Sequence, residues 1–79
     1  MRVLLFAHLR NVAGRAEFDL KLEQPVDMDG LWHHLRTVHP ELEPFRSSVR
    51  LALNSEYVGR DARFADADEV ALIPPVSGG

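Results

Sequence analysis

The residues best suited to chemistry are the last six of the chain, residues 74–79, with the sequence Pro-Pro-Val-Ser-Gly-Gly. The two prolines fix a stiff, extended backbone. Six extended residues span roughly 20 Å, which is enough to enter the active site of another protein. Gly78 and Gly79 lack side chains, so they can pass through a narrow channel and bring the terminal carboxylate close to a reactive group. The pattern favours a tail that presents its carboxyl group to a partner.

A second interpretation of this ending stays open, because the end residues of many domains are poorly ordered and have no role. A terminal carboxylate, with an ordinary pKa of about 3.5, is ionised at neutral pH and is a poor electrophile. It reacts only after activation, for example as an acyl-adenylate. The chain contains no glycine-rich phosphate-binding loop. Any activation must therefore come from another protein.

Composition excludes several other kinds of chemistry. The 79 residues include no cysteine, which rules out a thiol nucleophile, a disulfide framework and a cysteine-ligated metal site. A chain of this size buries only about 60% of its unfolded surface and leaves little room for a closed pocket. We therefore expect a carrier, a binding module or a subunit rather than a self-contained enzyme.

The charge pattern and the N-terminus exclude two further classes of partner. Nine lysines and arginines are scattered among twelve acidic residues, whereas small nucleic-acid-binding domains usually carry a strongly basic face. The apolar run at residues 1–7 is too short for the core of a signal peptide or for a membrane span. We expect a cytoplasmic protein that binds neither nucleic acid nor a membrane.

The four histidines do not have the spacing of a metal site. His33 and His34 are adjacent, so their side chains point about 100° apart on a helix. His8 and His39 have no recognisable ligand spacing with them. We therefore expect no bound metal.

Hydrophobic periodicity predicts the elements that position the tail. The apolar run at residues 3–7 predicts a central strand. Residues 11–14 predict a turn, in which Gly14 can adopt a backbone conformation that other residues avoid. Residues 17–22 alternate polar and apolar side chains, which predicts an antiparallel strand that forms a hairpin with the first.

A single helix is predicted from residue 28 to residue 38. Apolar residues recur there at helical spacing, and Asp27 is a suitable N-cap. Gly30 weakens the helix by about 1 kcal/mol relative to alanine. His39 precedes a proline, which ends the helix. We expect Trp32 to belong to the core.

The second half of the chain is rich in short strands. The predicted strands lie at residues 49–53, 57–58 and 69–73. A loop or irregular turn at 41–48, a turn at 54–56 and an acidic turn at 66–68 connect them. We expect Tyr57 to pack within the short strand at 57–58. The fold class is therefore α+β, with a mixed sheet and one main helix packed on one face.

Alternation along the strands also predicts an apolar face opposite the helix, formed by Leu4, Phe6, Ala52, Ala71 and Ile73. An exposed apolar patch of this kind usually marks a protein interface. The alternative is that the loop around Phe45 or Phe64 covers it. Arg10, just past the first strand, either contacts a partner at the rim of this face or is simply solvated.

Both ends of the chain resemble the small, sulfur-carrier subunit of molybdopterin synthase, a ubiquitin-like family. Residues 6–10 (Phe-Ala-His-Leu-Arg), with Gly14 downstream, resemble the opening of that family. Residues 66–71 (Asp-Ala-Asp-Glu-Val-Ala), followed by residues 73–79, resemble its ending. The resemblance spans nearly the whole chain. It implies a ubiquitin-like β-grasp fold over a single domain, residues 1–79, with residues 74–79 as its extended reactive tail.

Two positions depart from the family pattern. Ala67 stands where the acidic turn usually carries glycine, and Asp27 stands where the helix usually opens with threonine. Both substitutes suit their positions.

The resemblance implies a sulfur carrier that catalyses no step itself and binds no cofactor. A ubiquitin-activating-type enzyme uses ATP to adenylate Gly79, and a sulfur donor converts the terminus to a thiocarboxylate. The tail then enters the large subunit of the synthase, where sulfur passes to cyclic pyranopterin monophosphate. Gly78 permits the close approach. The residues implied to bind partners are Phe6, Arg10, Ile73, Pro74, Pro75 and Val76.

Two alternatives share the fold and the Gly-Gly ending. One is a sulfur carrier for thiamine or cysteine synthesis. The other is a protein modifier that is joined through Gly79 to lysines of target proteins. The stretch at residues 74–77 (Pro-Pro-Val-Ser) favours the molybdopterin carrier over the thiamine carrier, but it does not exclude a modifier.

Overall fold

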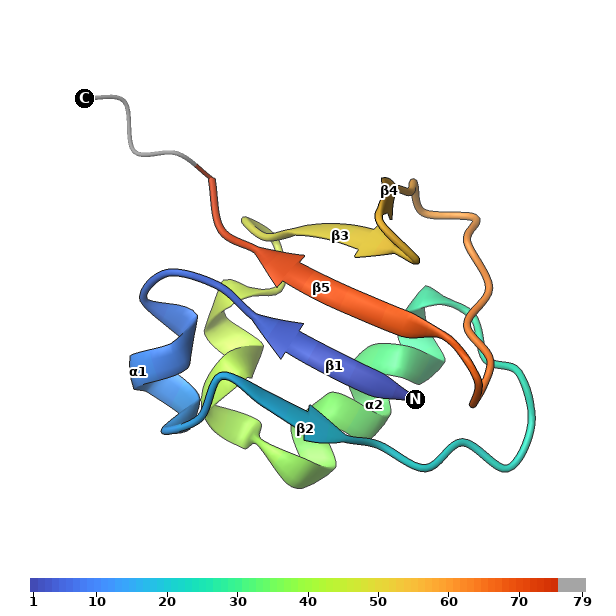
Figure 1. Ribbon diagram of the computed structural model, residues 1–79, viewed down its shortest axis with the longest axis horizontal. Coiled ribbons are helices and arrows are strands. Elements are labelled where there is room, and N and C mark those ends of the chain that lie inside the picture. The colour runs from blue at the N-terminus through green and yellow to red at the C-terminus, as the bar shows by residue number, and fades with distance from the viewer. Residues whose placement is uncertain (76–79) are drawn as a thin grey trace.

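A mixed sheet organises residues 1–75, the part of the chain that the computed structural model describes (Figure 1). Its five strands run in the spatial order β2-β1-β5-β3-β4. β1 pairs with β5 in parallel, and every other neighbouring pair is antiparallel. The strands are β1 (Arg2–Leu5), β2 (Glu17–Asp19), β3 (Arg50–Leu53), β4 (Glu56–Tyr57) and β5 (Glu69–Ile73).

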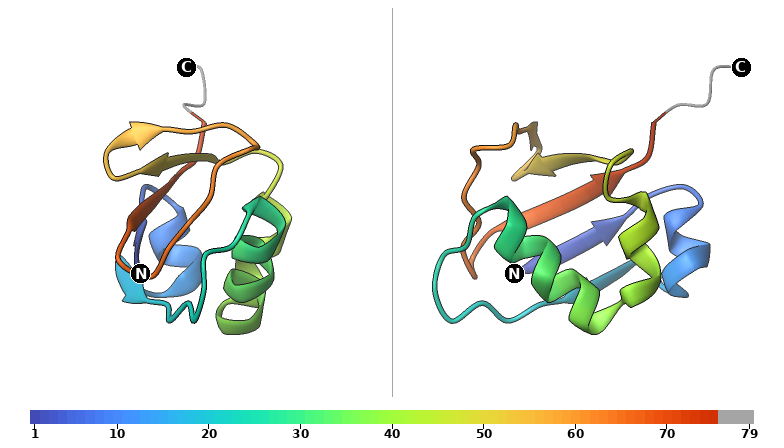
Figure 2. Two further views of the ribbon diagram at one scale, coloured as in Figure 1. Left: turned by 90° about the vertical axis from the view of Figure 1, so that its right-hand side faces the viewer. Right: turned by 180° about the vertical axis from the view of Figure 1, so that it is seen from behind.

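The main helix lies across one side of this sheet, as Figure 2 shows. The helical elements are α1 (Leu9–Ala13), α2 (Met28–Val38) and the short 3₁₀ helix η1 (Pro40–Phe45). Between α2 and the sheet, the inward side chains of β1 and β5 are almost completely buried: Val3, Leu5, Val70 and Leu72. The predicted α+β class, with a mixed sheet and one main helix on one face, is confirmed.

Helix α2 follows the prediction at both of its ends. The Asp27 carboxylate accepts a hydrogen bond from the backbone N–H of Gly30 at 2.9 Å, which caps the helix. Leu31, Trp32 and Leu35 are buried against the sheet, and His39 is the C-cap. The glycine at position 30 has a packing role, because a Cβ there would lie 2.8 Å from the Cβ of Val26.

The region after the first strand differs from the prediction. β1 ends at Leu5 rather than at residue 7, and Ala7 has a positive φ of 54° that turns the chain. A helix, α1, then replaces the predicted turn at residues 11–14. Leu9 is buried, and Val12 and Ala13 pack against the core, so three apolar residues at helical spacing stabilise this element. Gly14 ends it with φ 78°, as expected of a glycine C-cap.

The pairing of β1 with β2 is antiparallel as predicted, but α1 stands between the two strands, so they do not form a simple hairpin. β2 is also shorter than the predicted strand at residues 17–22. Leu20 and Leu22 still point into the core. The backbone N–H of Leu20 donates to the carbonyl of Met1 at 2.8 Å, which holds this segment beside the start of β1.

The second half of the chain matches the prediction closely. β5 has the predicted bounds, and β3 begins one residue later than predicted. A short 3₁₀ helix occupies residues 40–45 and overlaps the irregular region predicted at 41–48. In the turn before β4, Asn54 and Ser55 adopt positive φ values of 50° and 75°. Strand β4 itself begins one residue earlier than predicted.

Asp66 ties three parts of the chain together. Its carboxylate accepts a hydrogen bond from the backbone N–H of Leu22 at 2.8 Å and another from the N-terminal ammonium of Met1 at 3.3 Å. The same ammonium donates to the carbonyl of Leu20 at 2.8 Å. The Leu22 N–H, followed by the ammonium, lowers the pKa of Asp66 below its usual value. The turn before β5 is thereby fixed to the start of β1.

We expect Asp66→Asn to lower the free energy of unfolding at neutral pH, because the amide replaces a charged acceptor of these bonds. The lowered pKa of Asp66 means that its stabilising contribution is complete above the unfolded value of about 3.9 and is lost as the pH falls through the lower folded value. The gap between variant and parent should therefore close in acid. Urea denaturation at a series of pH values measures it.

The exposed residue Asp61 provides the matched control, since Asp61→Asn removes a carboxylate of the same loop region. That variant should show no comparable loss of stability at neutral pH. A stability gap for Asp66→Asn that stays constant from neutral to acidic pH would contradict the role assigned to the charge.

Candidate functional site

The tail leaves the sheet between the ends of two other strands. β5 ends at Ile73, whose register partner on β3 is Arg50. On the other side, the backbone N–H of Phe6 donates to the carbonyl of Leu72 at 3.3 Å, directly after the parallel pairing of Leu5 with Leu72. The start of the tail is therefore held next to Phe6 and to the first residue of β3.

The six predicted partner-binding residues do not all share one environment. Phe6 is 44% exposed, and Ile73 is partly buried beside it. Pro75 is exposed, whereas Pro74 is buried. Arg10 is exposed on α1. Val76 lies outside the described residues, and so do Gly78 and Gly79, to which the chemistry was assigned.

A shallow hollow of about 250 Å³ lies on the side of the sheet opposite α2. We call its lining the open sheet face; it consists of Leu4, Phe6, Ala52, Ser55, Tyr57, Glu69, Ala71 and Ile73. All five apolar residues predicted for this face belong to it. Arg10 is absent from the lining, so the structure brings together Phe6 and Ile73 but not Arg10.

The loops that were considered as covers of this face pack elsewhere. Phe64 is completely buried in the core, and its backbone forms a bridge with Val26, next to α2. Phe45 packs against the same core, with its ring centroid 5.4 Å from that of His8. Within residues 1–75 the open sheet face therefore remains accessible.

The structure adds two residues that the sequence analysis did not assign to this face. Tyr57 is 58% exposed on the open sheet face, so the prediction that it packs within the short strand is wrong. The guanidinium carbon of Arg50 lies 4.3 Å from the centre of the Tyr57 ring, a cation–π contact. Alternation around the inward Leu51 already places Arg50 on this face, but its contact with Tyr57 depends on the register between β3 and β4.

The hollow combines an apolar floor with a polar edge. Arg2 and Glu17 form an ion pair at 3.9 Å on the same side of the sheet, and Glu69 lies at one end of the hollow. Apolar centres with polar rims are typical of protein interfaces. What this arrangement can do is bind another protein directly beside the start of the tail.

Among residues 1–75, no group of three or more histidine, aspartate or glutamate side chains is arranged to hold a metal ion. Within the same part of the chain, no helix has both the length and the apolar character that crossing a membrane requires.

Comparison with known proteins gives full-length matches. The model of the ThiS family matches residues 3–79. The molybdopterin synthase sulfur carrier subunit of Arabidopsis thaliana is 40% identical, over 100% of this chain and 82% of that protein. The protein of the same name from Chlamydomonas reinhardtii is also 40% identical, over 100% of this chain and 98% of that protein.

Solved structures confirm the predicted ubiquitin-like β-grasp fold. The crystal structure of SAMP1 from Haloferax volcanii superimposes with a TM-score of 0.85 and 30% identity, covering 100% of this chain and 98% of that one. A chain from the complex of subunits 1 and 2 of molybdopterin-converting factor from Helicobacter pylori gives a TM-score of 0.69 at 24% identity, covering 99% of this chain and 96% of that one. At that identity the second likeness concerns the fold alone.

Proposed function

The chain belongs to the ThiS family, and from this premise we propose that it is a sulfur carrier in molybdopterin biosynthesis, acting as the small subunit of a molybdopterin synthase. The proposal rests above all on one observation: an accessible apolar sheet face lies directly beside the strand that leads into the Pro-Pro-Val-Ser-Gly-Gly ending. The name shared by the plant and algal relatives supports this pathway over other sulfur pathways.

The chemistry proposed for Gly79 begins with activation by a partner. A ubiquitin-activating-type enzyme joins the terminal carboxylate to the AMP portion of ATP and releases pyrophosphate. Sulfur at the oxidation level of sulfide then attacks the carbonyl carbon. A carbon–sulfur bond forms, the carbon–oxygen bond to AMP breaks, and AMP leaves with that oxygen. The product is a thiocarboxylate, and no step changes the oxidation state of the glycine carbon.

The second half of the proposed cycle takes place in the large subunit. The open sheet face docks on that subunit, and the tail carries the thiocarboxylate to cyclic pyranopterin monophosphate. The thiocarboxylate sulfur attacks a carbon of the precursor, and a carbon–oxygen bond at that carbon breaks as the oxygen leaves as water. A second water molecule then hydrolyses the thioester between this sulfur and the glycine carbonyl, which restores the Gly79 carboxylate and leaves the sulfur on the precursor. Because both catalytic centres belong to partners, this chain needs only a docking face, a stiff exit and a thin end.

The face offers two aromatic anchors for such docking. Phe6 and Tyr57 both expose a substantial part of their rings, and aromatic residues often dominate the binding energy of an interface. Arg50 holds one side of the Tyr57 ring, so that less rotational freedom is lost when a partner covers it. Pro74, which is buried, contributes to the direction of the tail rather than to direct contact. Arg10 remains available at α1, outside the hollow.

A second function, protein modification through Gly79, is favoured by the likeness to the small archaeal modifier protein 1 of Haloferax volcanii, since two crystal structures of that protein superimpose with TM-scores of 0.85 and 0.83. A carrier for thiamine or cysteine synthesis has no comparable support. The cytoplasmic location and the adenylating enzyme remain part of the proposal.

The assignment of Gly79 is tested by mass spectrometry of the intact chain. We expect incubation with the adenylating enzyme of the same organism, ATP and a sulfide source to add the mass difference between one sulfur and one oxygen atom. A variant that lacks Gly79 provides the control and should gain nothing. If the complete chain never gains this mass, every sulfur-carrier interpretation is wrong.

The docking role is tested by removing one aromatic anchor. We expect Phe6→Ala to weaken binding to the large subunit by about 1–3 kcal/mol, because truncation of a central aromatic anchor usually costs that much. Val38→Ala is the matched control, since Val38 is 45% exposed but lies on α2, on the other side of the sheet. Titration calorimetry with the large subunit measures both. Equal losses for the two variants would show that the open sheet face does not dock.

If the chain is a protein modifier, its conjugates are identified by the peptide that trypsin leaves on the modified lysine. The last tryptic site of this chain is Arg63, so trypsin leaves residues 64–79 on a modified lysine rather than Gly-Gly. We expect a modifier to yield this branched remnant in cell extracts. Lysine-linked chains of copies can use only Lys21, the single lysine of the sequence. Lys21→Arg would therefore abolish these links and spare conjugates with other proteins. Extracts without any such remnant would contradict modification.

A further inference from the structure

Charged residues on the open side of the sheet are separated along the direction of the strands. Where β5 begins, Glu69 is the register partner of Arg2, which also lies opposite Asp19 on β2. Phe18 points into the core, so its neighbours Glu17 and Asp19 point to the open side. Arg2 pairs with Glu17 at 3.9 Å, which leaves Glu69 and Asp19 as an excess of negative charge at this end.

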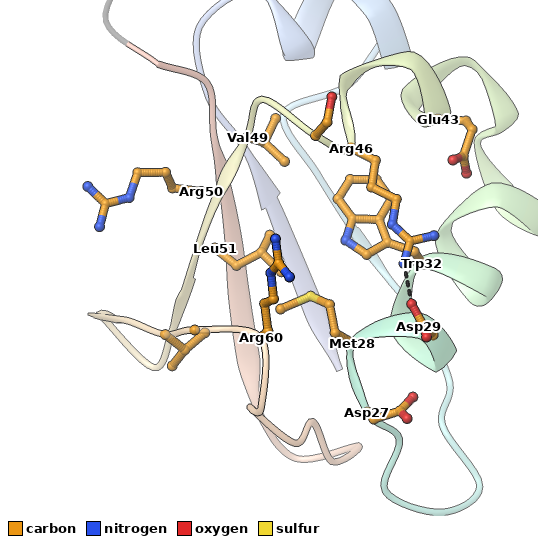
Figure 3. Close-up of a pocket in the computed structure, with 13 residues that line it drawn as sticks. Asp27, Met28, Asp29, Trp32, Glu43, Arg46, Val49, Arg50, Leu51 and Arg60 are labelled. Atoms are coloured by element: carbon orange, nitrogen blue, oxygen red, sulfur yellow. Dashed lines mark hydrogen bonds and ion pairs between the residues drawn. The ribbon is translucent and has the colours of Figure 1, made fainter.

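The other end of the open sheet face, where the tail emerges, carries positive charge. Arg50 is exposed and is the register partner of Ile73. Figure 3 shows its side chain directed away from α2, and its guanidinium carbon lies 4.3 Å from the centre of the Tyr57 ring. Within residues 1–75, neither Arg50 nor Glu69 has an ion-pair partner. Each is therefore available to pair with a charge on another molecule.

An apolar middle separates these two charged ends. Glu69 and Ile73 stand four positions apart on β5, which is about 13 Å along a strand. The residues between the two ends that line the hollow are Leu4, Ala52 and Ala71. Alanine side chains are short, so the hollow of about 250 Å³ can receive larger side chains from another surface.

A face with this distribution of charge is complementary to itself. When two copies bring their open sheet faces together with the β5 strands antiparallel, the basic end of each copy lies over the acidic end of the other. A two-fold axis that runs across the strands gives this arrangement, so Arg50 of each copy approaches Glu69 of the other. Parallel β5 strands would instead place like charges over each other. The charges therefore select one orientation.

We propose that the chain forms a symmetric dimer through the open sheet face when no other protein covers it. Burial of Phe6, Tyr57 and Ile73 favours association, and the paired charges set the antiparallel orientation. The contact surface is small, so the dimer is weak and reversible. The proposal does not depend on the sulfur-carrier role, because it uses neither Gly79 nor any sulfur chemistry.

Dimerisation would compete with the docking of other proteins. The second copy covers Phe6 and Tyr57, the two aromatic residues that we propose as anchors for the large subunit. Both rings would then stay out of water until a partner of higher affinity displaces the second copy. A weak dimer suits this exchange, because little binding energy is lost when it separates.

Sedimentation equilibrium of the full chain tests the self-association. We expect the average mass to rise with concentration from that of one chain toward that of two, with matching changes in amide NMR shifts at Ala71 and Tyr57. Phe6→Ala should weaken association by about tenfold. Val38→Ala is the matched control on α2 and should associate like the parent, since Val38 is 45% exposed on the other side of the sheet.

Charge reversal gives the decisive comparison. Arg50→Glu places glutamate opposite glutamate in the dimer, and Glu69→Arg places arginine opposite arginine, so each variant alone should associate at least about tenfold more weakly. An equimolar mixture of the two variants should form a mixed dimer, because opposite charges then meet at both ends. Native mass spectrometry detects it, since the variants differ in mass. Arg50→Glu combined with Glu69→Arg should restore self-association.

Arg63→Glu is the matched control for net charge, because Arg63 is exposed but does not line the open sheet face. It should associate like the parent. Equal weakening by Arg63→Glu and Arg50→Glu would reduce the effect to net charge and overturn the proposed pairing. Absence of a mixed dimer would overturn it as well.

Two further results would overturn the dimer itself. A mass of one chain at every concentration up to the millimolar range would leave the open sheet face to other proteins alone. Concentration-dependent NMR shifts around Trp32 instead of Ala71 would place the contact on the helix side. Neither result would affect the mass-spectrometric test of Gly79, so the dimer and the proposed function can fail separately.

Discussion

The parallel pairing of β1 with β5 is the interaction on which the rest of the structure depends. It aligns the first strand of the chain with the last, so that Val3 lies beside Val70 and Leu5 beside Leu72. Parallel strands need a crossover connection, and the intervening chain supplies it through α2. Ordering so long a connection is entropically costly, and the cost is offset mainly by burying the inward side chains of both strands under α2. The N–H of Phe6 continues the pairing and fixes where the tail emerges.

The same alternation that builds the core also creates the binding surface. Each central strand directs one set of side chains toward α2 and the next set toward the opposite side. On β5 this places Leu72 in the core and Ile73 beside Phe6, immediately before Pro74. A change of register by one residue would exchange the two sets and destroy the core. The position of the open sheet face next to the tail is thus enforced by the stability of the fold.

The sequence predicts most where a signal is local and repeated. α2 has a capping residue, an apolar stripe and a following proline, and its bounds were predicted correctly. α1 was missed because its apolar residues, Leu9, Val12 and Ala13, complete little more than one turn and are followed by the turn signal of Gly14. Its stability comes from packing against the core, which no short window of sequence reveals.

The candidate sites divide in the same way. Alternation alone predicted the apolar members of the open sheet face, because they repeat along strands. The contact of Arg50 with Tyr57 could not be predicted, since it depends on how β3 pairs with β4 across the turn at Asn54 and Ser55.

The distribution of amines also suits the activation that we propose for the terminus. An acyl-adenylate is attacked by free amines, whereas guanidinium groups stay protonated and do not compete. The chain has eight arginines and a single lysine, Lys21. In the sheet register, Arg2 lies opposite Asp19, the last residue of β2, and opposite Glu69, the first residue of β5. Lys21 follows β2 and therefore lies beyond the end of the sheet at which β5 begins. The N-terminal ammonium lies at that same end and is held by Asp66 and Leu20. Both amines therefore lie at the end of the sheet opposite Ile73, where the tail emerges.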